Sequence, residues 1–277
     1  LCVFEQHGPD LSVVTPAMKV FRPKSLLQKL QHVEYLVALF FYRVMSHFDA
    51  LFVAPGPFSL YRTGTVRKLG GFDVHSITED QEIGYRMQKN HYRLKHCFDA
   101  YVYTMTPTTV MQLYRQRSRW WRGSMLTSFK YRSLFLNPRY GHFGVFQLPM
   151  ILFGYITVWF VAFFFAYFTV LPWWQNFYSL YLVGFDFATL LKGLSISLDV
   201  LRYDIGRSLI ILTLTAFSIA IFLLSHKSAK EVLFKHGFLY LPVYFVFYYI
   251  LLSFIYVAAA AQLLVSGGKD KWLGKSI

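Results

Sequence analysis

The sequence predicts an α/β domain followed by membrane-spanning helices. Short strand-like and helix-like stretches alternate over residues 1–145, and long apolar runs dominate residues 146–277. Alternation of this kind is typical of α/β layer packing. The composition agrees with a membrane part, because 55% of the 277 residues are hydrophobic and 15% are charged, against roughly 25% charged residues in an ordinary soluble domain.

Charge also separates the two regions. Residues 1–145 hold 19 Lys+Arg and 9 Asp+Glu, a net charge of +10, whereas residues 146–277 hold 9 and 5, a net charge of +4. The apolar mass excludes a disordered chain, and Cys2 and Cys97 are too few cysteines for a disulfide-stapled module. No signal-peptide pattern opens the chain. Because the first residue is Leu1 rather than Met, we expect a piece of a longer protein.

Three elements are expected at the start of the basic half. Residues 11–16 form a β-branched run that ends in proline, which predicts a short strand. Residues 24–49 carry apolar side chains at helical spacing and predict a helix. Residues 51–62 predict a strand, a Pro-Gly-Pro turn and a second strand, and Gly70-Gly71 marks a further turn.

A helix start follows at Thr78. Thr78 and Gln81 have the spacing of a capping box, and Glu79 and Asp80 would lie in the first turn, where the helix dipole favours acidic residues. We expect this helix to run to about Lys89. The pattern leaves two interpretations open: both acids only stabilise the helix start, or one of them serves as a general base.

Two extended stretches and another helix complete this half. Residues 92–97 alternate like an exposed strand, and residues 100–103 continue extended. Thr106-Pro107 predicts the start of the next helix, with proline at its first position.

That helix contains a cluster of arginines and tryptophans. Gln116, Arg119, Trp120 and Gly123 are spaced to share one helix face, and we expect Arg117 to point elsewhere. Such a cluster suits nucleic acid, a membrane anchor, or a diphosphate gripped by arginine beside a sugar stacked on indole. The adjoining membrane spans disfavour nucleic acid, and the cluster alone does not choose between the other two.

Three apolar runs predict membrane spans at about 146–174, 208–225 and 238–265, each near the roughly 20 residues that cross a bilayer core. The stretch 177–201 is apolar but carries three charged residues, so we interpret it as an interfacial helix rather than a fourth span. The basic half is expected in the cytoplasm, which makes the protein a multi-pass protein of the cell (plasma) membrane that contacts lipids. Three or four spans place the C-terminus on opposite sides, and the sequence leaves this open.

Two motifs, in this order and spacing, resemble those of a known family. They are Thr78-Glu79-Asp80 and, 36 residues after that aspartate, Gln116-x-x-Arg119-Trp120. The pair resembles the paired motif of family 2 membrane glycosyltransferases, which include cellulose, chitin, hyaluronan and poly-N-acetylglucosamine synthases. Residues 55–62 and 70–73 resemble the segments that precede the first motif in this family, and the similarity extends over roughly residues 10–145. The resemblance implies a partial GT-A-type glycosyltransferase domain over residues 1–145 and a membrane domain over residues 146–277.

The resemblance also implies an activity. Family members transfer a sugar from a nucleotide sugar, here expected to be a UDP-sugar, to a glycan or lipid-linked acceptor at the cytoplasmic membrane face, with inversion. Asp80 would be the general base that deprotonates the acceptor hydroxyl. Glu79, Gln116, Arg119 and Trp120 would bind substrate, with the arginine stabilising the leaving diphosphate and the indole packing against the acceptor sugar.

One family feature is missing from this sequence. The resemblance implies Mg²⁺ or Mn²⁺ held by an Asp-x-Asp motif, and no Asp-x-Asp occurs in these 277 residues. We therefore expect a C-terminal part that lacks the nucleotide-binding half and is not active alone. The alternative is a non-catalytic membrane subunit or pseudoenzyme that uses this half as an interaction surface.

Overall fold

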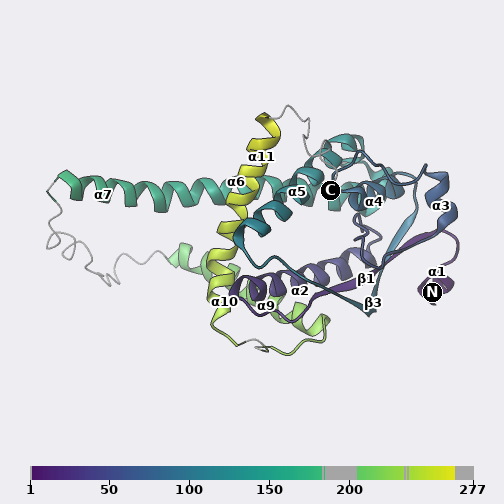
Figure 1. Ribbon diagram of the computed structural model, residues 1–277, viewed down its shortest axis with the longest axis horizontal. Coiled ribbons are helices and arrows are strands. Elements are labelled where there is room, and N and C mark those ends of the chain that lie inside the picture. The colour runs from purple at the N-terminus through teal and green to yellow at the C-terminus, as the bar shows by residue number, and fades with distance from the viewer. Residues whose placement is uncertain (1, 183, 185–204, 234, 236, 266–277) are drawn as a thin grey trace.

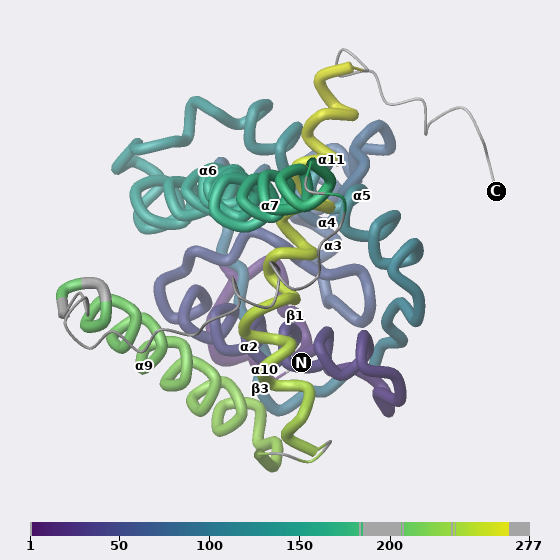
Figure 2. The backbone as a smooth tube through the Cα atoms, turned by 90° about the vertical axis from the view of Figure 1, so that its left-hand side faces the viewer, coloured from purple at the N-terminus to yellow at the C-terminus, as the bar shows by residue number. Residues whose placement is uncertain are grey.

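The computed structural model describes residues 2–182, 184, 205–233, 235 and 237–265 (Figures 1 and 2). The soluble half contains α1 (Cys2–His7), β1 (Leu11–Val20), α2 (Leu26–His47), β2 (Leu60–Tyr61), α3 (Thr63–Lys68), α4 (Glu79–Lys89), β3 (Arg93–Thr104) and α5 (Val110–Lys130). Two 3-10 turns follow, η1 (Arg132–Leu134) and η2 (Pro138–Tyr140). The apolar half contains η3 (Phe143–Gln147), α6 (Leu148–Phe165), η4 (Ala166–Val170), α7 (Leu171–Leu182), α9 (Ile205–Ser228), α10 (Tyr240–Val243), η6 (Tyr244–Tyr248) and α11 (Tyr249–Val265).

The strands form a sheet in the order β2-β1-β3, and the predicted α/β fold class is confirmed. β1 pairs in parallel with β3 and antiparallel with β2. The predicted strand end at Pro16 is wrong, because β1 continues through this proline to Val20. The two extended stretches expected at 92–97 and 100–103 are one strand, and the register shifts where Pro16 faces Cys97 and Ala17 faces Tyr101.

Two other predicted boundaries are wrong. In the segment 51–62 only Leu60–Tyr61 is a strand. The helix expected to open at Pro107 begins three residues later, at Val110. Its N-cap is Thr109, whose hydroxyl accepts a hydrogen bond from the Gln112 amide, while the Gln112 side chain accepts one from the Thr109 amide. This capping box provides hydrogen-bond acceptors for the first free N–H groups of α5. A proline at the first helical position has no side-chain acceptor for these groups, so the helix begins after Thr109.

Helix α2 joins the sheet to the apolar helices. One side of α2 packs against β1 and β3, and its buried Leu36 and Leu39 form a cluster with Ala17 and Ala229. Its buried Leu30 and Val33 lie in a second cluster with side chains of α5, α9, α10, η6 and α11. The apolar helices therefore pack directly on the α/β half.

Within the described residues, three helices are long and apolar enough to cross a membrane by length and composition: Phe143–Leu182, Ser208–Ser228 and Tyr240–Val265. The first has 40 residues, which at 1.5 Å per residue gives about 60 Å, twice the roughly 30 Å of a bilayer core. Its apolar stretch is 6% buried inside the protein, against 39% for the third helix. The third helix is thus the one that the α/β half covers most.

The third helix runs across the first instead of alongside it. In Figure 1 the segment α6–α7 extends away from the α/β half, whereas α10–α11 stands across its base. Figure 2 shows α6–α7 nearly end-on, pointing toward the viewer, and α10–α11 upright. Two helices that cross in this way do not both follow one membrane normal. How many of the three helices span the membrane stays a prediction. The interfacial helix expected at 177–201 lies mostly outside the described residues, and its first residues continue α7.

Close packing at two glycines ties α4 and α5 to their neighbours. A Cβ atom at Gly84 of α4 would collide with the backbone carbonyl group of Phe52, and one at Gly123 of α5 would lie 2.5 Å from the side chain of Thr78. Backbone cannot move aside as a flexible side-chain tip can, so Gly84 is the stricter of the two positions.

We expect Gly84→Ala to lower the free energy of unfolding by about 1–3 kcal/mol, because overpacking a tight contact forces the backbone to shift. The matched control is Gly64→Ala in α3, where a Cβ atom meets nothing within 4 Å. Alanine there should be neutral or slightly stabilising, since it is the better helix former. Thermal unfolding of the purified protein measures both, and equal melting temperatures for the two variants would contradict the close approach.

Candidate active site

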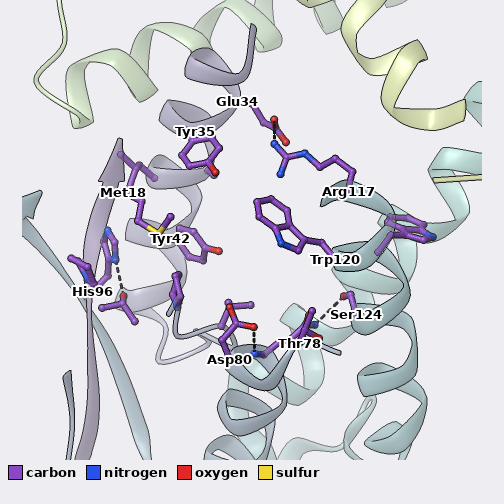
Figure 3. A pocket seen from close by; sticks show the side chains of 18 of the residues that line it. Met18, Glu34, Tyr35, Tyr42, Thr78, Asp80, His96, Arg117, Trp120 and Ser124 are labelled. Carbon is purple, nitrogen blue, oxygen red and sulfur yellow. Dashed lines mark hydrogen bonds and ion pairs between the residues drawn. The ribbon is translucent and has the colours of Figure 1, made fainter. Parts of the chain in front are cut away.

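A pocket of about 340 Å³ lies where the α/β half meets the apolar helices (Figure 3). Its walls come from β1, α2, the start of α4, α5, α6 and α11. Aromatic side chains supply much of the surface: Tyr35, Tyr42, Trp120, Trp121, Tyr155 and Tyr256. Aromatic faces suit the apolar faces of sugar rings, and their hydroxyl and indole groups add polar contacts.

Asp80 is the carboxylate at the lower end of this pocket in Figure 3. It is the second residue of α4, and its Oδ1 accepts a hydrogen bond of 2.8 Å from the Gln81 amide. Burial raises the pKa of Asp80 above its ordinary value and Glu79 adds to the shift, while the Gln81 amide and the Arg119 guanidinium oppose it. A raised pKa makes a carboxylate a stronger base, which suits proton abstraction.

His96 is the second titratable group on this side of the pocket. Its Nδ1 lies 2.9 Å from the Thr15 hydroxyl, and burial lowers its pKa to about 4. The ring is therefore neutral near pH 7 and is a weak base. Asp80 is the better candidate for removing a proton.

The capping box expected between Thr78 and Gln81 is wrong. Thr78 is the N-cap residue of α4, but its side chain makes no capping hydrogen bond. It packs against Gly123 of α5, and the Gln81 amide group donates instead to Ser124 Oγ at 2.9 Å. Contacts with α5 have replaced the local cap, so the start of α4 is fixed by tertiary packing.

The face of α5 that lines the pocket is offset from the expected one. Arg117, Trp120, Trp121 and Ser124 line the pocket, again at positions i, i+3, i+4 and i+7. The expectation that Arg117 points elsewhere is wrong, because it is 1% exposed and forms an ion pair with Glu34 of α2 at 2.7 Å. Burial disfavours its charge, but Glu34 holds the pKa of Arg117 above its ordinary value.

The five residues expected at the site divide into two groups. Asp80 and Trp120 both line the pocket. Glu79 and Arg119 are exposed beside it, and Arg119 Nη1 donates to the Ile77 carbonyl oxygen at 3.4 Å. Gln116 is half-buried and does not line the pocket. The structure therefore brings together the aspartate and the tryptophan in the pocket, and the other three are not among the residues that line it.

A buried network holds α4 in place. Glu82, 1% exposed, accepts hydrogen bonds from Lys130 at 2.9 Å and from Tyr131 at 2.7 Å, and it pairs with Arg86 at 2.5 Å. Lys130 also pairs with Asp73 at 2.8 Å, which ties the preceding loop to the end of α5. Burial alone would raise the pKa of Glu82, but these partners lower it. Asp80 and Glu82, two positions apart in the chain, thus have opposite pKa shifts.

Several pocket residues were not found by sequence reasoning. Glu34, Tyr35 and Tyr42 come from α2, and Tyr155 and Tyr256 come from α6 and α11. Glu34 carried a signal, because it is the only acidic residue among the 22 of α2. A carboxylate on the partly buried face of such a helix usually has a partner. The tyrosines carried none, since aromatic residues are frequent throughout this chain.

The pocket residues of this chain do not fit a divalent cation. Among the residues that the structure describes, no three His, Cys, Asp or Glu side chains come together in a group that could hold a metal ion. Of the two pocket carboxylates, Glu34 is already paired with Arg117. No step is therefore derived through a metal held by this chain, and Mg²⁺ or Mn²⁺ stays an expectation of the family resemblance.

Comparison with known proteins identifies the family of this chain. A sequence model described as glycosyl transferase family group 2 matches residues 3–265. The chain belongs to this family.

Individual relatives are more distant. The chain is 29% identical over 119 residues to a protein of Staphylococcus aureus (strain COL) named poly-beta-1,6-N-acetyl-D-glucosamine synthase, and 28% identical over 119 residues to one of the same name from Staphylococcus epidermidis. Each match covers 43% of this family 2 chain and 29% of the relative, so the matched segment spans less than a third of these relatives.

We expect Asp80→Asn and Glu82→Gln to change stability in opposite directions at pH 7. Ionised Asp80 lowers the free energy of unfolding. This loss of stability is absent below the ordinary pKa of an aspartate and grows as the pH rises through the raised pKa of Asp80, so Asp80→Asn should leave the melting temperature equal or higher. Ionised Glu82 instead raises the free energy of unfolding. This stabilisation is fully present above the ordinary pKa of a glutamate and is lost as the pH falls through the lowered pKa of Glu82.

Glu82→Gln should cost about 3 kcal/mol, because it leaves Lys130 and Arg86 without their buried partner. Thermal unfolding at pH 7 measures both variants. A large loss of stability in Asp80→Asn would mean that this carboxylate has a structural role instead.

Proposed function

We propose that this family 2 chain carries the acceptor site and the general base of a membrane glycosyltransferase that extends a polysaccharide. The observation that carries the proposal is Asp80, a half-buried carboxylate with a raised pKa, in one pocket with the indole of Trp120. The named relatives are poly-beta-1,6-N-acetyl-D-glucosamine synthases. We therefore propose N-acetylglucosamine as the transferred sugar and UDP as its carrier.

The reaction is a single displacement with inversion. Asp80 takes the proton of the acceptor hydroxyl while that oxygen attacks the anomeric carbon of the donor sugar, and the bond to the nucleoside diphosphate breaks. Trp120 packs against the acceptor sugar and holds its hydroxyl toward Asp80. Arg119, whose charge acts on Asp80, stabilises the negative charge of the leaving diphosphate. Glu79 and Gln116 contribute to substrate binding.

The pocket's position suits an acceptor that reaches the membrane. Tyr155 and Tyr256 belong to two of the apolar helices, so the pocket wall is shared between the α/β half and these helices. We propose that the α/β half lies at the cytoplasmic face of the cell membrane, as its net charge of +10 favours. The growing glycan would then leave the pocket on its membrane side.

Asp80→Asn in the full-length protein, with its nucleotide-binding half, should reduce incorporation of radiolabelled N-acetylglucosamine from its UDP donor by at least about 10²-fold, because general-base catalysis contributes roughly 10²–10⁴ in rate. The control is Asp99→Asn, which removes an exposed carboxylate of β3 that pairs with Lys230. It should incorporate sugar at the parental rate. Undiminished turnover by the Asp80 variant would remove Asp80 from the mechanism.

The pH dependence should follow from the same residue. Activity should rise with pH through the raised pKa of Asp80, because only the ionised carboxylate accepts a proton. Arg119 lowers that pKa, so Arg119→Gln should move the acidic limb of the kcat/KM profile to higher pH. An acidic limb that stays in place or moves to lower pH would show that another group titrates.

A further inference from the structure

Glu34 stands at the end of the pocket opposite Asp80. Figure 3 shows Glu34 and Arg117 at the upper end and Asp80 at the lower end, with Tyr35 and Tyr42 of α2 on one side and Trp120 of α5 on the other. A sugar held against Trp120 thus has one carboxylate at each end of its binding space. The general base accounts for only one of them.

Only one oxygen of Glu34 is used inside the protein. Arg117 Nη2 and the Tyr248 hydroxyl both donate to Oε2, each at 2.7 Å. Oε1 makes no hydrogen bond within the described part of the chain, and the side chain is 25% exposed where it lines the pocket. Because both partners bind Oε2, they fix the orientation of the carboxylate and so the direction in which Oε1 points.

Arg117 connects this carboxylate to the indole. Its guanidinium lies 4.3 Å from the ring centroid of Trp120 while it pairs with Glu34. A cation over an aromatic face is attracted to it, and the attraction increases where water is excluded. The orientations of the Glu34 carboxylate and of the Trp120 ring are therefore coupled through a single buried side chain.

We propose that Glu34 is an acceptor-binding residue, whose Oε1 accepts a hydrogen bond from a hydroxyl of the acceptor glycan, and that Arg117 is the positioning residue for both Glu34 and Trp120. This inference rests on the proposed function. A carboxylate accepts hydrogen bonds and does not donate them, so it selects a hydroxyl-bearing sugar and repels an anionic one. Together with Trp120, Glu34 determines how deeply the acceptor glycan binds in the pocket and therefore which of its hydroxyl groups reaches Asp80.

The test measures acceptor binding separately from turnover. A β-1,6-linked N-acetylglucosamine pentamer is titrated into the full-length protein in detergent, in an Asp80→Asn background that blocks transfer, and tryptophan fluorescence reports binding. Adding Glu34→Gln should raise the Kd about tenfold, the effect of losing one charge-assisted hydrogen bond. In the Asp80-containing protein, Glu34→Gln should raise the KM for the pentamer and leave the KM for the UDP-sugar unchanged.

The matched control is Glu231→Gln. Glu231 forms a comparable buried ion pair with Lys19 at 3.0 Å, also between the α/β half and the apolar helices, but it does not line this pocket. It should lower the melting temperature about as much as Glu34→Gln and leave the Kd unchanged. If Glu34→Gln does not fold, Glu34→Asp is the second variant. Its shorter side chain keeps a negative charge beside Arg117 but moves the unbonded oxygen away from the pocket, and it should also raise the Kd for the pentamer.

The outcomes separate the two proposals. Absence of sugar incorporation by the unsubstituted full-length protein would overturn the proposed function, and the role of Glu34 with it. Incorporation together with equal pentamer affinity for the Glu34 variants and the parent would overturn the role of Glu34 alone. Equal weakening by Glu231→Gln would also overturn it, because the effect would then follow from loss of an ion pair anywhere between the two halves.

Discussion

The contact between Gly123 of α5 and Thr78 at the start of α4 is the constraint on which the site depends. Because Gly123 has no side chain, Thr78 packs directly on the α5 backbone, and the Gln81–Ser124 hydrogen bond locks the same junction. This junction places the first turn of α4 beside the aromatic face of α5. As a result α4 has no local side-chain cap, since the Thr78 side chain makes no capping hydrogen bond.

Two carboxylates in this turn show how environment assigns different roles to one chemical group. Asp80 faces a pocket, its principal partner is a backbone amide, and burial raises its pKa. Glu82 faces the core, where Lys130, Tyr131 and Arg86 surround it and lower its pKa. These opposite pKa shifts suit the proposed division between a reactive Asp80 and a structural Glu82. The two residues differ because their side chains leave α4 in different directions, one toward the pocket and one toward the core.

The membrane part also contributes to the site. Tyr155 and Tyr256 line the pocket, and Tyr256 stacks on Trp121 with ring centroids 4.4 Å apart. Tyr248 reaches Glu34 from η6, so the same apolar segment both completes the wall and supports the ion pair. A helix that is apolar enough to enter a bilayer here packs on the α/β half and crosses the base of α6–α7 (Figure 1).

The sequence by itself determined the α/β class, the three apolar helices and the helix from Glu79 to Lys89, because each of these depends on local spacing and composition. The motif residues Asp80 and Trp120 came from the resemblance to a family. Only the tertiary structure decided which face of α5 meets the pocket and that Arg117 pairs with Glu34. Helical periodicity defines a face to within about one residue, and one residue turns a side chain by about 100°. The Glu34–Arg117 pair joins side chains 83 residues apart, and no local pattern encodes such a contact: it exists only once α2 and α5 have packed around the same pocket.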